Sequence, residues 1–422
     1  MKASARPGYW SFYWPLALTS VVLLLERQFQ NGVLARYPDA AVGLATFALA
    51  ASSFQLVHAS LSFIPQMIAV QARTRQARRA CRNFVVTAGC VLSLPLVWIG
   101  FTATGQHLLA GLLNIPEALL PDVTRYLRWL APLVLVDALR QYNTGILVLG
   151  EKTRRVTLLN AVHMLVLIGM LLAGRHLGWG ALPTIALATI SSNVLHLVLG
   201  LLLAARVETP DHGAGDRLTW TAMLRFFWPV AVTSTMFALT RPVLYAYVNL
   251  TDQAVVNVAA LRMAFDFAIF FQHPVNQFRH LYATFGAEDP AGVRRFMLRT
   301  TAVLVTLMAV IVFTPASRFI FGRILGAEGE VLRRTVQAMG VLCLAPLVIA
   351  LRNLSHGKML VLQRTLGMAG AGVLRVGATA LAAKGLYHLG LLNHRTACLV
   401  LVLGFSVEAL AAHAAIRKRR SG

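Results

Sequence analysis

Apolar segments long enough to cross a lipid bilayer recur along the whole chain of 422 residues. The hydrocarbon core of a bilayer is about 30 Å thick and needs roughly 20 helical residues at about 1.5 Å each. With 57% hydrophobic and only 13% charged residues, the chain has more apolar side chains than one soluble core of this size would bury. We therefore expect an integral membrane protein.

The apolar segments predict twelve transmembrane helices, separated by short polar, Arg-rich or Pro/Gly-containing breaks. The first of them carries two charged residues, Glu26 and Arg27, where contact with lipid would be costly. The expected spans are 10–34, 40–70, 83–104, 124–149, 156–174, 180–205, 222–249, 254–285, 297–316, 332–362, 366–387 and 395–416.

The net charge of +23 collects mainly in alternate loops. In a soluble protein this charge would suggest a nucleic-acid partner, but membrane proteins retain Lys and Arg in their cytoplasmic loops. We therefore expect no nucleic-acid partner, and we place these loops and both termini in the cytoplasm. The basic residues concerned are Arg73, Arg75, Arg78, Arg79, Arg82, Lys152, Arg154, Arg155, Arg294, Arg295, Arg299, Arg417, Lys418, Arg419 and Arg420.

The two halves of the chain match each other at an offset of about 214 residues. Two separate segments recur in the same order, and each has an Arg inside a predicted span. This agreement indicates an internal duplication. The matches are 12–15 with 226–229, Arg27 with Arg241, 130–134 with 344–348 and, two residues closer, Arg140 with Arg352 and Gly145 with Gly357.

A duplication of six helices predicts two pseudo-symmetric six-helix bundles of the same orientation, with a central cavity between them. The N-terminal bundle is expected at 1–205 and the C-terminal bundle at 222–422. The segment 206–221 is rich in turn-forming residues and predicts a cytoplasmic linker. The predicted fold class is an all-α membrane protein with twelve transmembrane helices.

Ionisable residues interrupt the apolar spans, and each needs a bundle interior or a watery cavity because a charge at the bilayer centre costs roughly 2.5–3.5 kcal/mol. Arg262 and Asp266 lie four residues apart and Asp137 and Arg140 three apart, so helical pairs are expected. Structural pairing explains these two pairs as well as a functional role does. The expected charge-pairing or gating residues are Glu26, Asp137, Arg262 and Asp266.

The cations outnumber the acids, which leaves Arg241, Arg279, Arg352 and Arg375 without an expected partner. Arg stays protonated and holds carboxylate or phosphate through two parallel hydrogen bonds, so an anionic substrate is predicted. The candidate substrate-binding residues are Arg241, Arg279, Arg352, Arg375, Arg27, Arg140 and Lys358.

The histidines and cysteines are not spaced as in known catalytic or metal-binding motifs. His58, His163, His196 and His273 lie within predicted spans, where they could carry protons, although a hydrogen-bonded or cavity-lining role explains them more simply. The four cysteines form no CxxC pair, and GxSxG and HExxH are absent from the sequence. We expect no enzyme, no metal and no cofactor.

At several of these positions the chain resembles the progressive ankylosis (ANK) transporter family of the multidrug/oligosaccharidyl-lipid/polysaccharide (MOP) exporter superfamily. The strongest match is 226–248, with Trp228-Pro229 followed by Arg241-Pro242. The chain departs from the family pattern at Arg27 and Arg140, which are basic only here. Supporting matches lie in 25–32 (Glu26, Gly32), 137–152 (Asp137), 278–285 (Arg279, Tyr282), and at Arg352 and Arg375.

This resemblance implies an exporter of small polyanions such as citrate, ATP or pyrophosphate, with two bundles (MATE/MOP-like) and alternating access. Two other functions stay open: a flippase for an anionic lipid-linked sugar, and a MATE-type drug antiporter. The latter normally uses an unpaired acid in the membrane, and among the acids only Glu408 has no Arg near it in sequence. Since 34 of the 39 basic residues are Arg and Ala and Leu abound, we expect a bacterial inner-membrane protein. We expect it to be a monomer surrounded by membrane lipid.

Overall fold

The computed structural model describes residues 8–72, 74–150, 152–207, 219–286, 288–362 and 365–417. All regular elements in these ranges are helices, and each predicted span contains between one and three consecutive helices. The predicted linker, 206–221, falls mostly outside the described residues. Eight helical segments of the described ranges are long and apolar enough to cross a membrane: Ala40–Ser62, Arg75–Phe101, Arg154–His176, Ala181–Ala204, Ala254–Tyr282, Pro290–Phe313, Gly329–Met359 and His394–Ile416.

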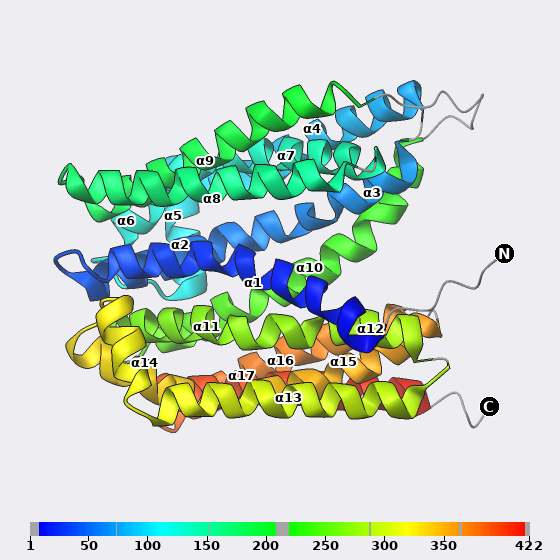
Figure 1. Cartoon of the computed structure of the whole chain (residues 1–422). Helices are drawn as coiled ribbons and strands as arrows, with labels where there is room; N and C mark the ends of the chain where they lie inside the picture. Colours follow the sequence, from blue (N-terminus) through cyan, green and yellow to red (C-terminus); the bar gives the residue numbers. More distant parts are fainter. Residues whose placement is uncertain are drawn as a thin grey trace. The chain divides into compact units, whose positions relative to one another are not determined.

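The chain forms two compact units, which are described separately (Figure 1). Unit 1 comprises Met1–Ala45 and Val243–Gly422, and in it α17 packs against both α15 and α16. Its helices are α1 (Tyr9–Leu34), α11 (Ala254–Asn276), α12 (Phe278–Phe285), α13 (Pro290–Phe313), the π-helix η2 (Arg318–Ile324), α14 (Gly329–Leu342), α15 (Ala345–Val361), α16 (Thr365–His388) and α17 (His394–Arg417).

Unit 2 comprises Thr46–Pro242, and in it α8 and α9 run side by side (Figure 1). α7 packs against α3, α4 and α9. The helices that lie in this unit, wholly or for most of their length, are α2 (Ala40–His58), the 3-10 helix η1 (Ala59–Phe63), α3 (Ile64–Gln71), α4 (Arg75–Phe101), α5 (Ala103–Leu113), α6 (Leu120–Leu130), α7 (Leu133–Leu149), α8 (Thr153–His176), α9 (Ala181–Ala204) and α10 (Trp220–Val248).

The first helix of each predicted half is grouped with the helices of the other half. In unit 1, α1 packs on α11 and α12, and the buried ring of Tyr13 stacks on Phe278 with centroids 5.3 Å apart. In unit 2, Phe227 of α10 meets Phe84 of α4 edge-on at 5.6 Å. The compact units therefore do not coincide with the predicted bundles 1–205 and 222–422, whereas the duplication itself stays a prediction.

Two helix breaks follow the repeated Leu-Ala-Pro-Leu-Val sequence. α6 ends at Leu130 and α7 begins after Pro132, while α14 ends at Leu342 and α15 begins with Ala345, one residue before Pro346. Proline has no N–H to donate and clashes with the carbonyl four residues earlier, but it fits the first turn of a helix. Each proline therefore ends one helix and starts the next.

Two glycines at matched positions allow close helix contacts. A Cβ on Gly145 would lie 2.6 Å from Cβ of Ile68 and 3.0 Å from the Pro65 carbonyl oxygen. A Cβ on Gly357 would lie 2.6 Å from Cβ of Tyr282 and 3.3 Å from the backbone oxygen of Arg279. Ile68 and Tyr282 themselves differ by 214 positions, so both units repeat the same close contact between two helices.

Candidate functional site

A buried ionic group lies among α12, α15, α16 and α17 of unit 1, and we call it the Glu408 cluster: Arg279, Arg352, His356, Arg375 and Glu408. Arg375 donates to Glu408 Oε2 over 2.8 Å and Arg352 donates to the same oxygen over 3.4 Å. His356 Nε2 lies 3.8 Å from Oε1 of Glu408. Arg375 and Glu408 are only 2% and 4% exposed, so these charges sit inside the helix bundle.

Arg352 is held from several sides. It donates to Oδ1 of Asn276 over 2.6 Å and to Oδ1 of Asn353 over 3.2 Å. The guanidinium carbons of Arg352 and Arg375 each lie 5.5 Å from the ring centroid of Phe405, which adds a cation–π attraction. Asn276 is the last residue of α11, two residues after Pro274, so the end of that helix supplies the acceptor.

Arg279 and Lys358 lie at the edge of this cluster. Among the described residues Arg279 is in no ion pair, and its buried Nε has no hydrogen-bond partner. It interacts electrostatically with Arg352 and His356. Lys358 places its Nζ 6.0 Å from the ring centroid of Tyr282. The cluster therefore contains three guanidiniums and one carboxylate.

The sequence-based expectation that Arg352 and Arg375 lack partners is wrong, because Glu408, which has no Arg near it in sequence, accepts hydrogen bonds from both. Glu408 comes from α17, 56 residues after Arg352 and 33 after Arg375. Helical spacing identifies only partners three or four residues away, so it did not pair Glu408 with Arg352 or Arg375. His356 lies four residues after Arg352 on α15, and the sequence interpretation left it out. Sequence reasoning also gave no place to Asn276 and Asn353.

A second polar group in unit 1 joins α1 to α11. The buried Asn31 accepts from Arg262 Nε over 2.8 Å and donates to Asp266 Oδ2 over 3.1 Å. Arg262 NH2 lies 3.4 Å from Asp266, and the more exposed Arg27 lies 3.7 Å from its other oxygen. On the same helix α1, Gln30 donates to Glu26 over 3.4 Å. Arg27 is thus balanced by Asp266 from another helix.

A third group lies in unit 2, and we call it the histidine cluster: His58, Asp137, Arg140, His163 and His196. Asp137 is 3% exposed; its Oδ1 accepts from Arg140 Nε over 2.8 Å and its Oδ2 lies 2.6 Å from His58 Nε2. Arg140 NH1 lies 3.4 Å from His196 Nδ1, and the His163 and His196 rings meet with centroids 5.8 Å apart. The cluster thus joins α2, α7, α8 and α9 around one carboxylate.

The predicted site residues are not all brought together. Arg279, Arg352, Arg375 and Lys358 lie in one region of unit 1, and Arg27, Arg262 and Asp266 in another. Asp137 and Arg140 belong to the histidine cluster. Arg241 lies half-buried on α10, within unit 2.

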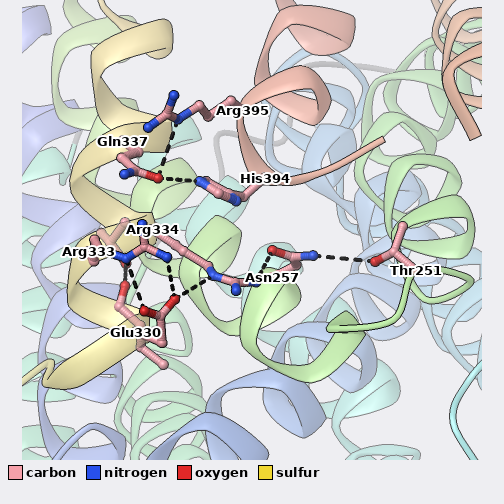
Figure 2. A network of polar contacts seen from close by, with 10 residues as sticks. Thr251, Asn257, Glu330, Arg333, Arg334, Gln337, His394 and Arg395 are labelled. Carbon is pink, nitrogen blue, oxygen red and sulfur yellow. Dashed lines mark hydrogen bonds and ion pairs between the residues drawn. The ribbon is translucent and has the colours of Figure 1, made fainter. Parts of the chain in front are cut away.

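A fourth polar network links α11, α14 and α17 at one end of unit 1 (Figure 2). Glu330 accepts from Arg333 and Arg334, and Arg334 also donates to Asn257 over 2.7 Å. Farther along α14, Gln337 Oε1 accepts from His394 and Arg395 at the start of α17 (Figure 2). Glu330 is half exposed, so this network ties helix ends together at the surface of the unit.

Solved structures with a similar fold are membrane transporters. A multidrug resistance MATE family transporter in an inward-facing conformation has a TM-score of 0.74 at 13% identity, over 96% of this chain and 98% of its own. Lipid II flippase MurJ scores 0.72 at 14%, over 96% and 87%. A MOP superfamily transporter from Pyrococcus furiosus scores 0.59 at 17%, over 99% and 97%. At these identities the likeness shows the fold.

Transporters of the MOP superfamily adopt this fold, and eight helical segments of the described ranges are long and apolar enough to cross a membrane, so the predicted MATE/MOP-like fold class is confirmed. The family model of the progressive ankylosis protein (ANKH) matches residues 1–253, more than half of the chain. The chain belongs to the ANKH family, as the resemblance of its sequence motifs indicated.

Proposed function

We propose that this transporter exports small polyanions of the citrate, ATP or pyrophosphate class by alternating access, and that the Glu408 cluster binds them. The observation that supports the proposal is the charge of that cluster. Arg279, Arg352 and Arg375 carry three positive charges and Glu408 one negative charge, which leaves two positive charges in excess. Buried charges without a counter-charge are costly, so a bound anion would stabilise the cluster.

The geometry of the cluster suits anion exchange. Glu408 serves as the internal counter-ion of Arg352 and Arg375 when no substrate is bound. An arriving polyanion accepts hydrogen bonds from the guanidinium groups, which present flat pairs of N–H donors. Arg279 has an unused buried Nε–H for this purpose. Arg27, Arg140, Arg241 and Lys358 stay proposed contributors to substrate binding.

For the MOP superfamily transporter from Pyrococcus furiosus, a reverse polarity of the binding pocket suggests a different function. This reversal concerns that protein alone. It supports the present proposal in one respect, because it shows that the charge of the pocket differs between transporters of this fold. An excess of arginine is the feature that an anion exporter needs.

Two other transport functions can be compared with anion export. The fold likeness to lipid II flippase MurJ favours a flippase for an anionic lipid-linked sugar, which would also need basic side chains. A MATE-type drug antiporter would need a free acid, but Glu408 is bonded to two arginines. The antiporter is therefore the weaker alternative.

Efflux from proteoliposomes tests the proposal. Purified protein is reconstituted with labelled citrate, ATP or pyrophosphate inside, and release is compared for wild type, Arg352→Gln and Arg279→Gln. Both variants should lower the efflux of a transported anion about tenfold or more, since each removes a charge-assisted bond worth about 1.5–3 kcal/mol. Arg175→Gln, which changes an exposed Arg at the end of α8, is the matched control.

The outcomes separate the alternatives. Saturable efflux that is lost in Arg352→Gln and kept in Arg175→Gln supports the proposal. Efflux unchanged in Arg352→Gln and Arg279→Gln would place the anion elsewhere. If none of the three anions is released, flipping of a fluorescent anionic lipid-linked sugar decides in favour of the flippase.

We also propose a bacterial inner-membrane location, with both termini cytoplasmic and the protein acting as a monomer in the lipid bilayer. The Arg-rich start of α4 supports this orientation because Lys and Arg stay in the cytoplasm. Single cysteines introduced by Arg75→Cys and Leu389→Cys into a background without the native cysteines test it. An impermeant thiol reagent added outside intact cells should label only the cysteine introduced at Leu389.

A further inference from the structure

Three buried positions of unit 1 have counterparts in unit 2 at one constant spacing. Arg140 and His196 are 56 residues apart, as are Arg352 and Glu408. The residues between them, His163 and Arg375, precede the last member by the same 33 positions. The trio of unit 2 thus maps onto the trio of unit 1 with an offset of 212 positions, the offset that also relates Gly145 to Gly357.

The two trios make the same contacts. In each, NH1 of the first Arg lies 3.4 Å from the third member, which is His196 Nδ1 in unit 2 and Glu408 Oε2 in unit 1. The second member also meets the third: the His163 and His196 rings are 5.8 Å apart between centroids, and Arg375 donates to Glu408 over 2.8 Å. The positions are therefore equivalent in space within each unit as well as in sequence.

The chemistry of the two trios differs. Arg and Glu are both ionised at neutral pH, so the unit 1 trio keeps its charges. The unit 2 trio has imidazoles in place of Arg375 and Glu408, and imidazole is the side chain that ordinarily gains and loses a proton close to neutral pH. Of the two matching third positions, His196 in unit 2 is therefore the one whose side chain ordinarily titrates close to neutral pH.

The contact between Arg140 and His196 requires one particular tautomer of the neutral His196 ring. A guanidinium only donates hydrogen bonds, so His196 Nδ1 must accept and its proton must be on Nε2. Nε2 is buried without a hydrogen-bond partner among the described residues. A proton added to Nδ1 removes the acceptor and places a positive charge beside Arg140, so the contact breaks.

Asp137 can hold Arg140 by a hydrogen bond after the contact between Arg140 and His196 has broken. Its Oδ1 accepts from Arg140 Nε, and its Oδ2 lies 2.6 Å from His58 Nε2. Proton binding by the cluster therefore moves Arg140 from a shared position toward Asp137. One added proton can therefore change the hydrogen bonds of Arg140 within the histidine cluster.

Several other ionisable groups of the helices around α7 bond to partners outside the histidine cluster. On α4, Arg78 donates to the Val207 carbonyl over 3.1 Å. On α6, Arg128 donates to the Gly100 carbonyl, and Asp122 pairs with Arg125. The described part of α3 has no ionisable side chain, and the remaining charges of α8 lie in its first and last turns. The groups that face His196 are thus those of the histidine cluster.

We propose that the histidine cluster is a proton-binding site, and that protonation of His196 releases Arg140 and couples proton movement to anion transport. The coupling rests on the proposed function, whereas the proton site does not. Unit 1 then holds the anion with its arginines, and unit 2 senses the proton at His196, the position that matches Glu408.

Histidine NMR tests the site without any substrate. Protein labelled with 15N-histidine is titrated in nanodiscs from about pH 5 to pH 8, the range in which imidazole changes charge. The signal that is lost in His196→Gln identifies His196, and it should shift with pH in wild type. A His196 signal that stays constant over this range would overturn the proposal. His176→Gln, at the exposed end of α8, should leave that signal in place.

Exchange of the trio tests the coupling. The double variant His163→Arg, His196→Glu gives unit 2 the side chains of unit 1, and His196→Gln keeps an acceptor for Arg140 that cannot be protonated. Wild-type efflux should change about threefold or more between pH 5.5 and 7.5, the range of imidazole titration. In both variants the dependence should disappear, while His176→Gln keeps it.

Equal pH dependence in wild type and both variants would overturn the coupling. If no anion is released from wild-type proteoliposomes, the proposed function fails, and the NMR titration still decides whether the proton site exists. Should the double variant not fold, His196→Gln alone carries the comparison, because it introduces neither a charge nor a larger side chain.

Discussion

Arg140 and Arg352 occupy matching positions in the two units, yet their counter-ions come from different places. Arg140 pairs with Asp137, one turn earlier on its own helix, and Arg352 with Glu408, on a helix 56 residues away. The cation is thus common to both clusters while the acid differs. The two units thus share a buried Arg at matching positions and differ in the groups around it, which gives two sites of different chemistry.

The largest effect is expected from removing the carboxylate of unit 1. Glu408→Gln leaves Arg352 and Arg375 buried without their shared counter-ion, which costs about 3–5 kcal/mol for a broken buried pair. His196→Gln at the matching position removes no charge and should cost below about 1 kcal/mol. Thermal unfolding in detergent, followed by tryptophan fluorescence, compares the two. Equal losses would show that the two clusters do not differ as described.

The two first helices offer the next comparison. Asn31 ties α1 to Arg262 and Asp266, whereas α10 has a neutral contact, Ser60 to Thr235, over 3.4 Å. Asn31→Leu removes hydrogen bonds to charged groups worth about 1.5–3 kcal/mol, and Thr235→Val should cost about 1 kcal/mol or less. Urea or SDS titration of the purified protein measures both. A larger loss for Thr235→Val would reverse the ranking of the two helix contacts.

The matched glycines should respond alike. Gly145→Ala and Gly357→Ala each place a Cβ 2.6 Å from a neighbouring Cβ, so overpacking should cost about 1–3 kcal/mol in either unit. Gly111→Ala, where a Cβ meets no atom within 4 Å, is the control. The same unfolding assay applies. A loss in only one of the two variants would break the symmetry of the contact.

The smallest change in stability is expected from two helix N-caps, one neutral and one charged. Thr74 caps α4 by accepting from Ala77 N, and Asp289 caps α13 by accepting from Gly292 N. The hydrogen bond from Tyr9 and that from Gly292 lower the pKa of Asp289. Its contribution is therefore present above the pKa of about 3.9 for an unfolded Asp and fades as pH falls through the lowered value.

Asp289→Asn should remove this acid dependence, whereas Thr74→Ala should cost about 0.5–2 kcal/mol at every pH because a hydroxyl does not titrate. Unfolding temperatures of wild type and both variants between pH 2 and pH 6 provide the measurement. An acid dependence that persists in Asp289→Asn would assign it to another carboxylate.

The sequence predicted the helices and the ion pairs that depend on patterns within a few residues. Apolar runs located the helices, while the breaks at Pro132 and Pro346 divide two spans, 124–149 and 332–362, that were each expected as one helix. The pairs of Arg262 with Asp266 and of Asp137 with Arg140 lie within one helical turn and were expected for that reason. These features need no knowledge of how distant helices pack.

The remaining features depend on tertiary packing. Glu408 meets Arg375 across 33 residues, and Asn31 meets Asp266 across 235, separations that no helical period encodes. The grouping of α1 with later helices was missed for the same reason. One signal was available: His196 and Glu408 stand at the offset of 212 already set by Arg140 and Arg352, so extending that offset along the chain would have paired the trios.

Direct binding of labelled pyrophosphate, citrate and ATP to the purified protein tests the central claim, that the Glu408 cluster is the anion site. Arg352→Gln should weaken the affinity for a bound anion about tenfold or more, since each 1.4 kcal/mol of lost interaction is a factor of ten. Arg175→Gln should bind like wild type. Unchanged affinity of Arg352→Gln for an anion that the wild type binds would contradict the account.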